Sequence, residues 1–278
     1  MKVCLFSSYS DRNVVYLYIQ FYLRQLRPHF DRILLITNER ELDLKTQQFL
    51  NDTGIELLLV ENEGYDFGMW YKGLKQINVA ECKQIAFVND SCILFKDISS
   101  TIEQLNGTGF EFSGITSSRE FKLHVQSYFT LAKGKRVLKA IRNYYESHGI
   151  TTVSAGENLK SKVIAIYEIG LSQHLIKKGF KVGSLYKAKR FGKKNRVLYD
   201  AVGLIEKGYP FVKKSLFLNS FSEPDRATLV SAKFDFNINY LKIMKNYSNI
   251  EFQNFKPMLL ELDESGRYAE EFLRLEAL

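Results

Sequence analysis

The chain has 278 residues, of which 45% are hydrophobic and 14% aromatic, and its formal net charge is +8. This length suits one large α/β domain or two small ones with a buried core, and the composition argues against extensive disorder. No run approaches the roughly 18 apolar residues of a membrane span, and the N-terminus has a buried-strand pattern rather than that of a signal peptide. We therefore expect a cytoplasmic protein.

Cysteine and histidine usage gives no sign of a disulfide framework or a zinc site. The three cysteines, Cys4, Cys82 and Cys92, are odd in number and unpaired in spacing, which predicts reduced buried thiols. The four histidines form no HxxxH pattern, and no CxxC occurs.

The first third of the chain alternates predicted strands with predicted helices. Strands are expected at 3–7, 32–36, 55–60 and 84–88, and helices at 14–26, 44–51 and 69–77. Ser10 or Asp11 is expected to cap the first helix. This alternation is typical of a parallel, nucleotide-binding type of sheet.

Ligands of such sheets bind beyond the carboxyl ends of the strands. Polar residues follow all four predicted strands, and we expect them to meet at one edge. They are Ser7, Ser8, Tyr9 and Ser10 after the first strand, Thr37, Asn38 and Glu39 after the second, 61–68 after the third, and Asn89, Asp90 and Ser91 after the fourth.

The pattern changes after residue 110. Mixed or antiparallel strands are expected at 110–116 and 125–133, then helices at 136–147 and 168–178 on either side of a polar stretch at 151–162, and a strand at 181–185. Two amphipathic helical pieces follow at 237–244 and 268–278. These patterns predict an α/β fold, with a Rossmann-type mixed, mostly parallel sheet flanked by helices in a domain at 1–221 and a helical extension at 222–278 packed on it.

Two carboxylates stand out as candidates for chemistry. Asp90, at the end of an apolar strand, can coordinate Mg²⁺ or Mn²⁺ there, or it can simply cap a turn. Glu168 is predicted in the first turn of a helix, where the helix dipole keeps it ionised as a general base requires; helix capping alone explains it equally well.

A polar row near residue 125 is a candidate for binding an acceptor or sugar hydroxyls. It consists of His124, Gln126, Ser127 and Tyr128. His124 is equally readable as an ordinary loop residue.

Basic residues are concentrated at 177–214, where twelve Lys and Arg residues face only Asp200 and Glu206. Such a field attracts phosphates, anionic lipid headgroups or nucleic acid, although a solvated basic face has the same pattern. No RNA-binding signature or helix-turn-helix pattern accompanies it, so we expect no nucleic-acid partner.

Several segments together resemble the rhamnan synthesis protein F family, bacterial glycosyltransferases of polysaccharide assembly. The resemblance spans about 3–217 and is carried by the segments ENEGYDFGMWYKGL, FVNDSCILF, HVQSYF, YEIGLSQHLIKKGFKVGSLY and LIEKGYPFVKKSLF.

The resemblance implies a GT-A-like fold and inverting transfer of a sugar, typically from dTDP-L-rhamnose, to a cell-surface polysaccharide or lipopolysaccharide. In that frame Asp66 and Gly68 approach the donor, Asn89, Asp90 and Ser91 occupy the DxD location with a divalent cation on Asp90, and Glu168 is the base.

We further expect Ser7, Ser8, Tyr9 and Asn38 near the donor nucleotide, and His124 as a second catalytic residue. The expected partners are a nucleotide sugar, a glycan or lipid-linked acceptor, and an anionic membrane surface on the inner face of the plasma membrane. The alternative is a non-catalytic scaffold of a glycan assembly complex, since Asn89, Asp90 and Ser91 contain one carboxylate where DxD contains two.

Overall fold

The computed structural model describes residues 1–151, 158–188 and 195–216, with the backbone alone at Val202. These residues form two compact units, each described here by itself. The larger unit contains residues 1–15, 26–90 and 101–188, and the smaller unit contains residues 16–25, 91–100 and 195–216.

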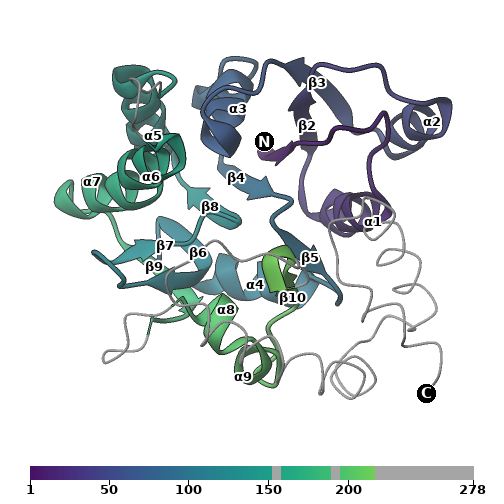
Figure 1. Ribbon diagram of the computed structural model, residues 1–278. Coiled ribbons are helices and arrows are strands. Elements are labelled where there is room, and N and C mark those ends of the chain that lie inside the picture. Colours follow the sequence, from purple (N-terminus) through teal and green to yellow (C-terminus); the bar gives the residue numbers. More distant parts are fainter. Residues whose placement is uncertain (152–157, 189–194, 217–278) are drawn as a thin grey trace. The chain divides into compact units, whose positions relative to one another are not determined.

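An eight-stranded sheet forms the centre of the larger unit, in the order β3-β2-β1-β4-β8-β6-β7, with β9 paired to β6 (Figure 1). The strands β1 to β4 are mutually parallel, and β7 and β8 run in the opposite direction. Their bounds are β1 (Lys2–Ser8), β2 (Arg32–Asn38), β3 (Glu56–Val60), β4 (Gln84–Asn89), β6 (Phe112–Ser118), β7 (His124–Val125), β8 (Phe129–Lys133) and β9 (Val182–Tyr186).

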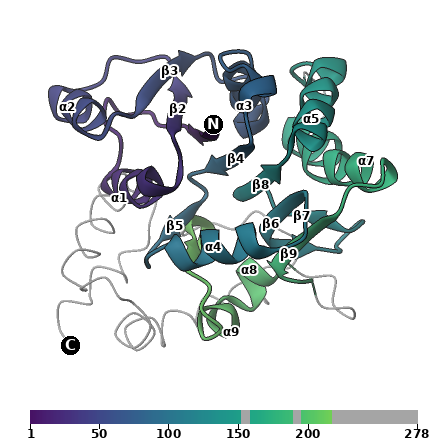
Figure 2. The same cartoon turned by 180° about the vertical axis from the view of Figure 1, so that it is seen from behind.

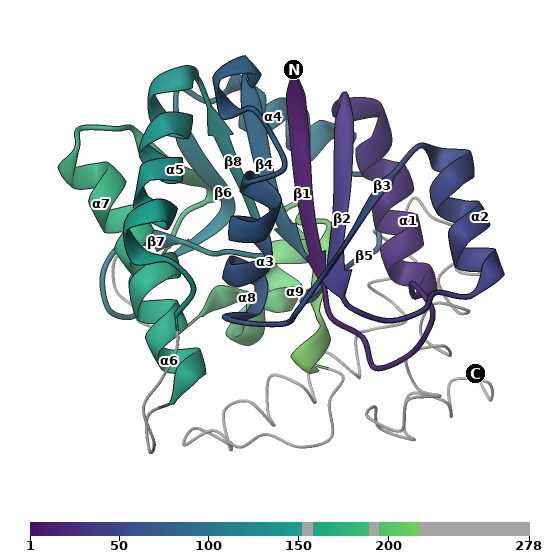
Figure 3. The ribbon, with the colours of Figure 1, turned by 90° about the horizontal axis from the view of Figure 1, so that it is seen from above.

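Helices α3, α5 and a long helix made of α6, a π-helical segment and α7 lie side by side over one face of this sheet (Figure 3). Their bounds are α3 (Tyr65–Leu74), α5 (Lys135–His148), α6 (Leu159–Val163), η3, the π-helix (Ile164–Gly170), and α7 (Leu171–Lys177). The larger unit also contains η1 (Arg27–His29), α2 (Leu44–Thr53), η2 (Val79–Glu81) and most of α4 (Ser99–Gly107).

Strand alternation decides which side chains meet these helices, because successive residues of a strand point to opposite faces. Val3 and Leu5 of β1 pack in one buried cluster with Ile85 and Phe87 of β4 and with Trp70 of α3. Residues of the same parity at the strand ends therefore face α3 as well.

The smaller unit is built on a two-stranded antiparallel sheet, in which Phe211 of β10 pairs with Leu94 of β5. Figure 2 shows β5, α8 and α9 of this unit from behind. The ring of Tyr22 packs 5.3 Å from that of Phe211. The elements of this unit are α1 (Leu17–Leu26), β5 (Cys92–Leu94), α8 (Arg196–Tyr199), α9 (Ala201–Ile205), β10 (Phe211–Lys213) and η4 (Lys214–Leu216).

The predicted fold class is confirmed: the sheet is of Rossmann type, mixed and mostly parallel, with flanking helices. The helical pieces at 237–244 and 268–278, and the rest of the extension at 222–278, lie outside the described residues, so the boundary near residue 221 stays a prediction. No helix within the described ranges is long and apolar enough to cross a membrane.

Three local predictions were wrong. The first helix begins at Leu17, so neither Ser10 nor Asp11 caps it. The single strand expected at 125–133 is divided into β7 and β8. The helix expected at 168–178 begins at Leu159 rather than at Glu168, inside a stretch whose polarity suggested a loop.

All three cysteines are buried free thiols. Burial raises the pKa of Cys4 and of Cys92, and also that of Cys82, where it is the largest cause. The reactive thiolate is therefore scarce at neutral pH.

We expect native protein to react slowly with a thiol reagent at pH 8, and all three thiols to react at once in denaturant. A chromogenic disulfide reagent with and without guanidinium measures this difference. Rapid labelling of even one thiol in the native protein would contradict the buried placement.

Candidate active site

The side chain of Asp66 lies over the carboxyl ends of β1 and β4. Its Oδ1 accepts a hydrogen bond from Ser7 Oγ at 3.0 Å, and its Oδ2 accepts one from Asn89 Nδ2 at 2.9 Å. Ser7 and Asn89 are register partners in the parallel pair β1–β4. They continue the strand faces that α3 covers, which explains why both reach a carboxylate carried by α3.

The chain enters α3 through a left-handed turn that places Asp66 there. Gly64 has φ +67°, and Tyr65 has φ +54°, the single positive φ of a non-glycine residue in the described ranges. A side chain in this region costs about 1–2 kcal/mol. Such strained residues are often found at functional sites.

Gly68 serves the packing of this turn. A Cβ at Gly68 would lie 1.7 Å from the carbonyl oxygen of Glu63. The glycine therefore lets the helix start approach the preceding chain, where the sequence led us to expect an approach to the donor. A donor contact by Gly68 stays a prediction.

Asp90 follows directly after β4 and is mostly buried. Its Oδ2 accepts a hydrogen bond from Ser8 Oγ at 3.2 Å. Ser7 and Ser8 are successive residues, as are Asn89 and Asp90. The ends of two neighbouring strands thus hold two carboxylates, each bonded to a serine of β1.

Asn38 braces the loop after β1. Its amide bonds both the N–H and the carbonyl of Ser10, at 3.1 and 2.8 Å, and its Oδ1 also accepts from Arg40 Nη1 at 2.6 Å. Asn38 is therefore engaged with the protein itself, and Tyr9 on the same loop is 51% exposed. The predicted donor contacts of both residues remain untested.

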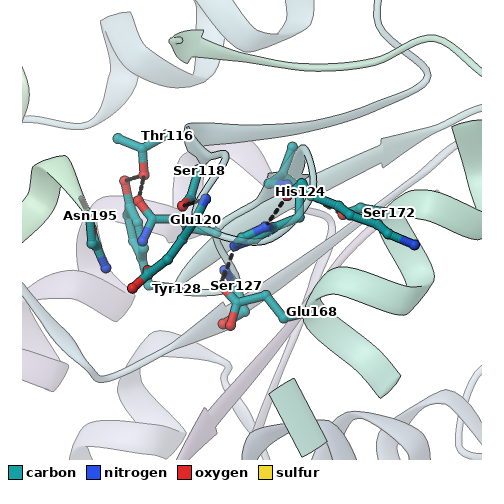
Figure 4. A network of polar contacts seen from close by, with 12 residues as sticks. Thr116, Ser118, Glu120, His124, Ser127, Tyr128, Glu168, Ser172 and Asn195 are labelled. Atoms are coloured by element: carbon teal, nitrogen blue, oxygen red, sulfur yellow. Dashed lines mark hydrogen bonds and ion pairs between the residues drawn. The ribbon is translucent and has the colours of Figure 1, made fainter. Parts of the chain in front are cut away.

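Glu168 projects from the long helix towards the start of β8 (Figure 4). Its Oε1 accepts a hydrogen bond from the backbone N–H of Ser127 at 3.2 Å and lies 4.0 Å from His124 Nε2. The Nδ1 of His124 lies 2.8 Å from the Lys122 carbonyl oxygen, which can only accept, so Nδ1 carries the proton in that bond. The Glu168 side chain is 15% exposed and that of His124 7%.

The predicted place of Glu168 within its helix was wrong. The residue lies in η3, ten positions after Asn158, whose side chain caps the helix start by accepting from Ser161 N–H. The dipole of a helix N-terminus acts within the first turn. Neither that dipole nor helix capping accounts for Glu168.

The two carboxylate groups are joined through β4 and β8. Asn89, whose side chain bonds Asp66, donates its backbone N–H to the Tyr128 carbonyl at 3.1 Å. Ser127, which donates to Glu168, is the preceding residue. A series of hydrogen bonds thus leads from Asp66 to Asn89, from Asn89 to the backbone of Tyr128 and Ser127, and from there to Glu168, all at one edge of the sheet.

A cavity of about 20 Å³ lies beside Glu168, enough room for one water molecule. Its polar lining comes from Ser127, Thr130, Glu168 and Ser172, and its apolar lining includes Phe67 and Tyr167. The candidate base therefore borders an aromatic wall that continues into α3.

Gln126 and Tyr128, two of the predicted acceptor-binding residues, contact the side chain of Thr116. Thr116 Oγ1 lies 2.7 Å from Gln126 Oε1 and 2.8 Å from Tyr128 Oη, and all three residues are buried (Figure 4). Ser91, predicted near the donor, belongs to the smaller unit and accepts a hydrogen bond from Lys213 Nζ at 2.8 Å.

Sequence reasoning missed Tyr144 and Tyr167, which hold the helix that carries Glu168. Tyr144 Oη donates to the Ile166 carbonyl at 2.7 Å, and Tyr167 Oη donates to the Gly149 carbonyl. Their sequence signal was only aromatic residues at helical spacing, which is typical of any core.

The described residues offer a single predicted metal ligand. No group of three or more His, Cys, Asp or Glu side chains suited to a metal occurs among residues 1–151, 158–188 and 195–216. Mg²⁺ is commonly held by one or two carboxylates together with substrate phosphates. Asp90 fits that mode, and its role as a ligand stays a prediction.

The rhamnan synthesis protein F family matches residues 33–264 of the chain. Because this match covers most of the sequence, the chain belongs to that family. Membership supports a transferase that uses a nucleotide sugar.

Known proteins with lower similarity were also found. The virulence protein VirA of Vibrio anguillarum is 29% identical over 225 residues, which is 67% of this chain and 71% of VirA. A cytidylyltransferase from Leptospira borgpetersenii shares 16% identity at a TM-score of 0.40, covering 90% of this chain and 100% of that one. Glucosyl-3-phosphoglycerate synthase from Mycobacterium tuberculosis was solved with Mn²⁺, UDP and phosphoglyceric acid. It shares 10% sequence identity at a TM-score of 0.41, covering 84% of this chain and 78% of that one. The structural likenesses are distant, and the family assignment rests on the family match alone.

Exchange of the bonded pair tests the placement of Asp66. In Asp66→Asn the bonds from Ser7 and Asn89 lose their charged acceptor and become weaker neutral bonds, so we expect the unfolding free energy to fall by about 1–3 kcal/mol. The double variant Asp66→Asn with Asn89→Asp rebuilds an amide–carboxylate pair and should recover most of the loss. Urea unfolding at pH 7 measures both, and a double variant no more stable than the single one would contradict the pairing.

Tyr65 offers a second test, through the sign of a stability difference. Glycine is normally less stable than alanine in a helix by about 1 kcal/mol. At a φ of +54° the order should reverse, because glycine relieves the strain that alanine keeps. We expect the unfolding free energy of Tyr65→Gly, measured in urea, to be about 1 kcal/mol higher than that of Tyr65→Ala. The opposite order would mean that the backbone at Tyr65 is not in the left-handed region.

Proposed function

We propose that the chain is a glycosyltransferase that moves a sugar from a nucleotide donor to a growing bacterial cell-surface polysaccharide, with inversion at the sugar C1. The series of contacts from Asp66 through Asn89 and the start of β8 to Glu168 carries this proposal. It brings a donor-side carboxylate and a candidate base to one sheet edge. The donor proposed from the family is dTDP-L-rhamnose.

On the donor side, Asp66 binds hydroxyls of the sugar or groups of the base. Ser7 and Asn89 hold its carboxylate in one orientation before any ligand arrives. Such preorganisation removes the need to order the side chain during binding. Asp90, fixed by Ser8, would hold a divalent cation whose bound charge neutralises the leaving diphosphate.

On the acceptor side, Glu168 takes the proton of an acceptor hydroxyl. The oxygen of that hydroxyl forms a bond to C1 while the bond from C1 to the diphosphate oxygen breaks, and the proton remains on Glu168. The Ser127 N–H stabilises the ionised carboxylate that begins this step. This bond replaces the helix dipole that the sequence suggested.

The basic segment at 177–214 is proposed to attract an anionic lipid-linked acceptor or the anionic leaflet that carries it. Its described lysines include Lys177, Lys178 and Lys181, close to the C-terminal end of α7. Each such residue near an anionic surface contributes about 1 kcal/mol.

A panel of nucleotide sugars tests the function directly. Purified protein is incubated with each donor and with a glycan acceptor extract, with Mn²⁺, with Mg²⁺ or with a chelator, and released nucleoside diphosphate is measured. Release above the rate of donor hydrolysis in buffer supports a transferase. Binding of a donor by calorimetry without any release would favour the non-catalytic scaffold, which the lone carboxylate of Asn89, Asp90 and Ser91 also suggests.

Glu168→Gln separates the base from its surroundings. Glutamine retains an oxygen that can accept from Ser127 N–H but cannot take up the acceptor proton, so we expect turnover to fall about 10²- to 10⁴-fold with donor affinity within twofold. Glu146→Gln is the matched control, since Glu146 is exposed and pairs with Arg142 on α5. Full transfer activity in Glu168→Gln would remove Glu168 as the base.

A further inference from the structure

The helix that carries Glu168 is interrupted by a seven-residue π-helix, η3, between α6 and α7. π-helical segments are rare, are less favourable than α-helix, and occur frequently at functional sites. Glu168 lies inside this segment, so the wider turn decides where its carboxylate points. Something in the surrounding structure must favour the π form over ordinary α-helix.

Tyr144 of α5 supplies that contact. Its hydroxyl donates to the Ile166 carbonyl at 2.7 Å, from outside the helix that contains this carbonyl. Burial is the main cause that raises the pKa of Tyr144 to about 12. The hydroxyl therefore stays protonated at neutral pH and remains a donor.

Gly170 makes room for this hydroxyl. A Cβ at Gly170 would lie 2.6 Å from Tyr144 Oη and 3.0 Å from the Ala165 carbonyl oxygen. The backbone of Gly170 is ordinary helix at φ −62°, so a left-handed conformation does not explain why glycine is present. The space that the tyrosine hydroxyl needs does explain it.

The aromatic ring of Tyr144 has separate contacts. It stacks on His148 with centroids 4.0 Å apart and lies 4.8 Å from the His174 ring. These contacts need no hydroxyl. Removal of the hydroxyl alone therefore leaves the packing of the ring in place.

We propose that Tyr144 is a positioning residue for Glu168, holding η3 in its π form through the Ile166 carbonyl, with Gly170 as the space it requires. The proposal rests on the proposed role of Glu168 as base. Without the hydroxyl the segment relaxes towards α-helix. One residue of register corresponds to a rotation of about 100° about the helix axis, which turns Glu168 away from Ser127 and His124.

Tyr144→Phe tests the kinetic consequence, with Tyr71→Phe as a matched control. Tyr71 also lies on a helix of this face, stacked 6.0 Å from Tyr145, and it does not line the cavity beside Glu168. We expect Tyr144→Phe to lower kcat about 10- to 100-fold with the donor KM within twofold, since misplacement by an ångström has effects of this size. Equal kcat in Tyr144→Phe and wild type would overturn the proposal.

A double-mutant cycle tests the coupling of the two residues. Gly170→Ala should lower kcat strongly in the wild-type background, because its Cβ displaces the hydroxyl. In the Tyr144→Phe background, Gly170→Ala should lower kcat further by less than threefold. Independent, multiplying effects would show that the two residues do not act through one contact.

Amide hydrogen exchange makes the proposal testable apart from activity. We expect residues 164–171 to exchange at least tenfold faster, or with an altered pattern, in Tyr144→Phe and at wild-type rates in Tyr71→Phe. Unchanged exchange in Tyr144→Phe overturns the positioning role even if the chain proves to be a scaffold. A wild-type protein that releases no nucleoside diphosphate, with exchange altered as expected, would remove the proposed function and leave the contact established.

Discussion

The stacking of Phe67 on Tyr167 is the contact on which the candidate site depends. Their ring centroids lie 5.4 Å apart with an interplanar angle of 19°, and both side chains are buried. Phe67 follows Asp66 in α3, and Tyr167 precedes Glu168 in η3. Because neighbouring helical residues point about 100° apart, rings that face the core leave the adjacent carboxylates at the rim of that core.

This ring pair belongs to a continuous aromatic layer over the sheet. Tyr167 also stacks on Tyr145 at 5.1 Å, and Trp70 packs edge-on against Phe67 at 5.0 Å while donating its Nε1–H to the Val88 carbonyl. Val88 directly precedes Asn89, the partner of Asp66. The same layer thus fixes α3, the end of β4 and η3 relative to one another, which is the rigid support that a site built on helices and strands requires.

The two carboxylates are stabilised in different ways. Asp66 accepts from a hydroxyl and an amide, both neutral side chains at strand ends. Glu168 accepts from a backbone N–H and lies beside an imidazole. A partly buried carboxylate needs such donors to remain ionised. Both oxygens of Asp66 accept from side chains at the ends of two neighbouring strands, which fixes the orientation of this carboxylate.

The sequence predicted the sheet edge well and the helix that carries Glu168 poorly. Apolar runs followed by polar residues located the ends of β1 and β4, and so the meeting of Ser7, Asp66, Asn89 and Asp90 could be anticipated. Asp66 bonds Ser7 and Asn89 rather than Ser8 and Asp90 because of strand parity and register. The register between two strands cannot be read from one sequence.

The beginning of the long helix, before Glu168, was missed because it is polar and because a π segment breaks the 3.6-residue period on which helix prediction rests. Its apolar positions before and after residues 164–170 lie on different helical phases. Glu168 then appears to begin a new helix. Such a break in pattern marks a place where tertiary contacts override local preference, and here the contact is the hydroxyl of Tyr144 on Ile166.

Two glycines share one physical purpose in this arrangement. Gly68 admits the Glu63 carbonyl and Gly170 admits the Tyr144 hydroxyl, at distances that exclude a Cβ. Each lies two positions after a candidate carboxylate, Asp66 or Glu168. Close approach of the chain to itself sets the direction of the carboxylate in both places. The glycine of the motif that first suggested a ligand-facing turn is thus required by internal packing against the Glu63 carbonyl.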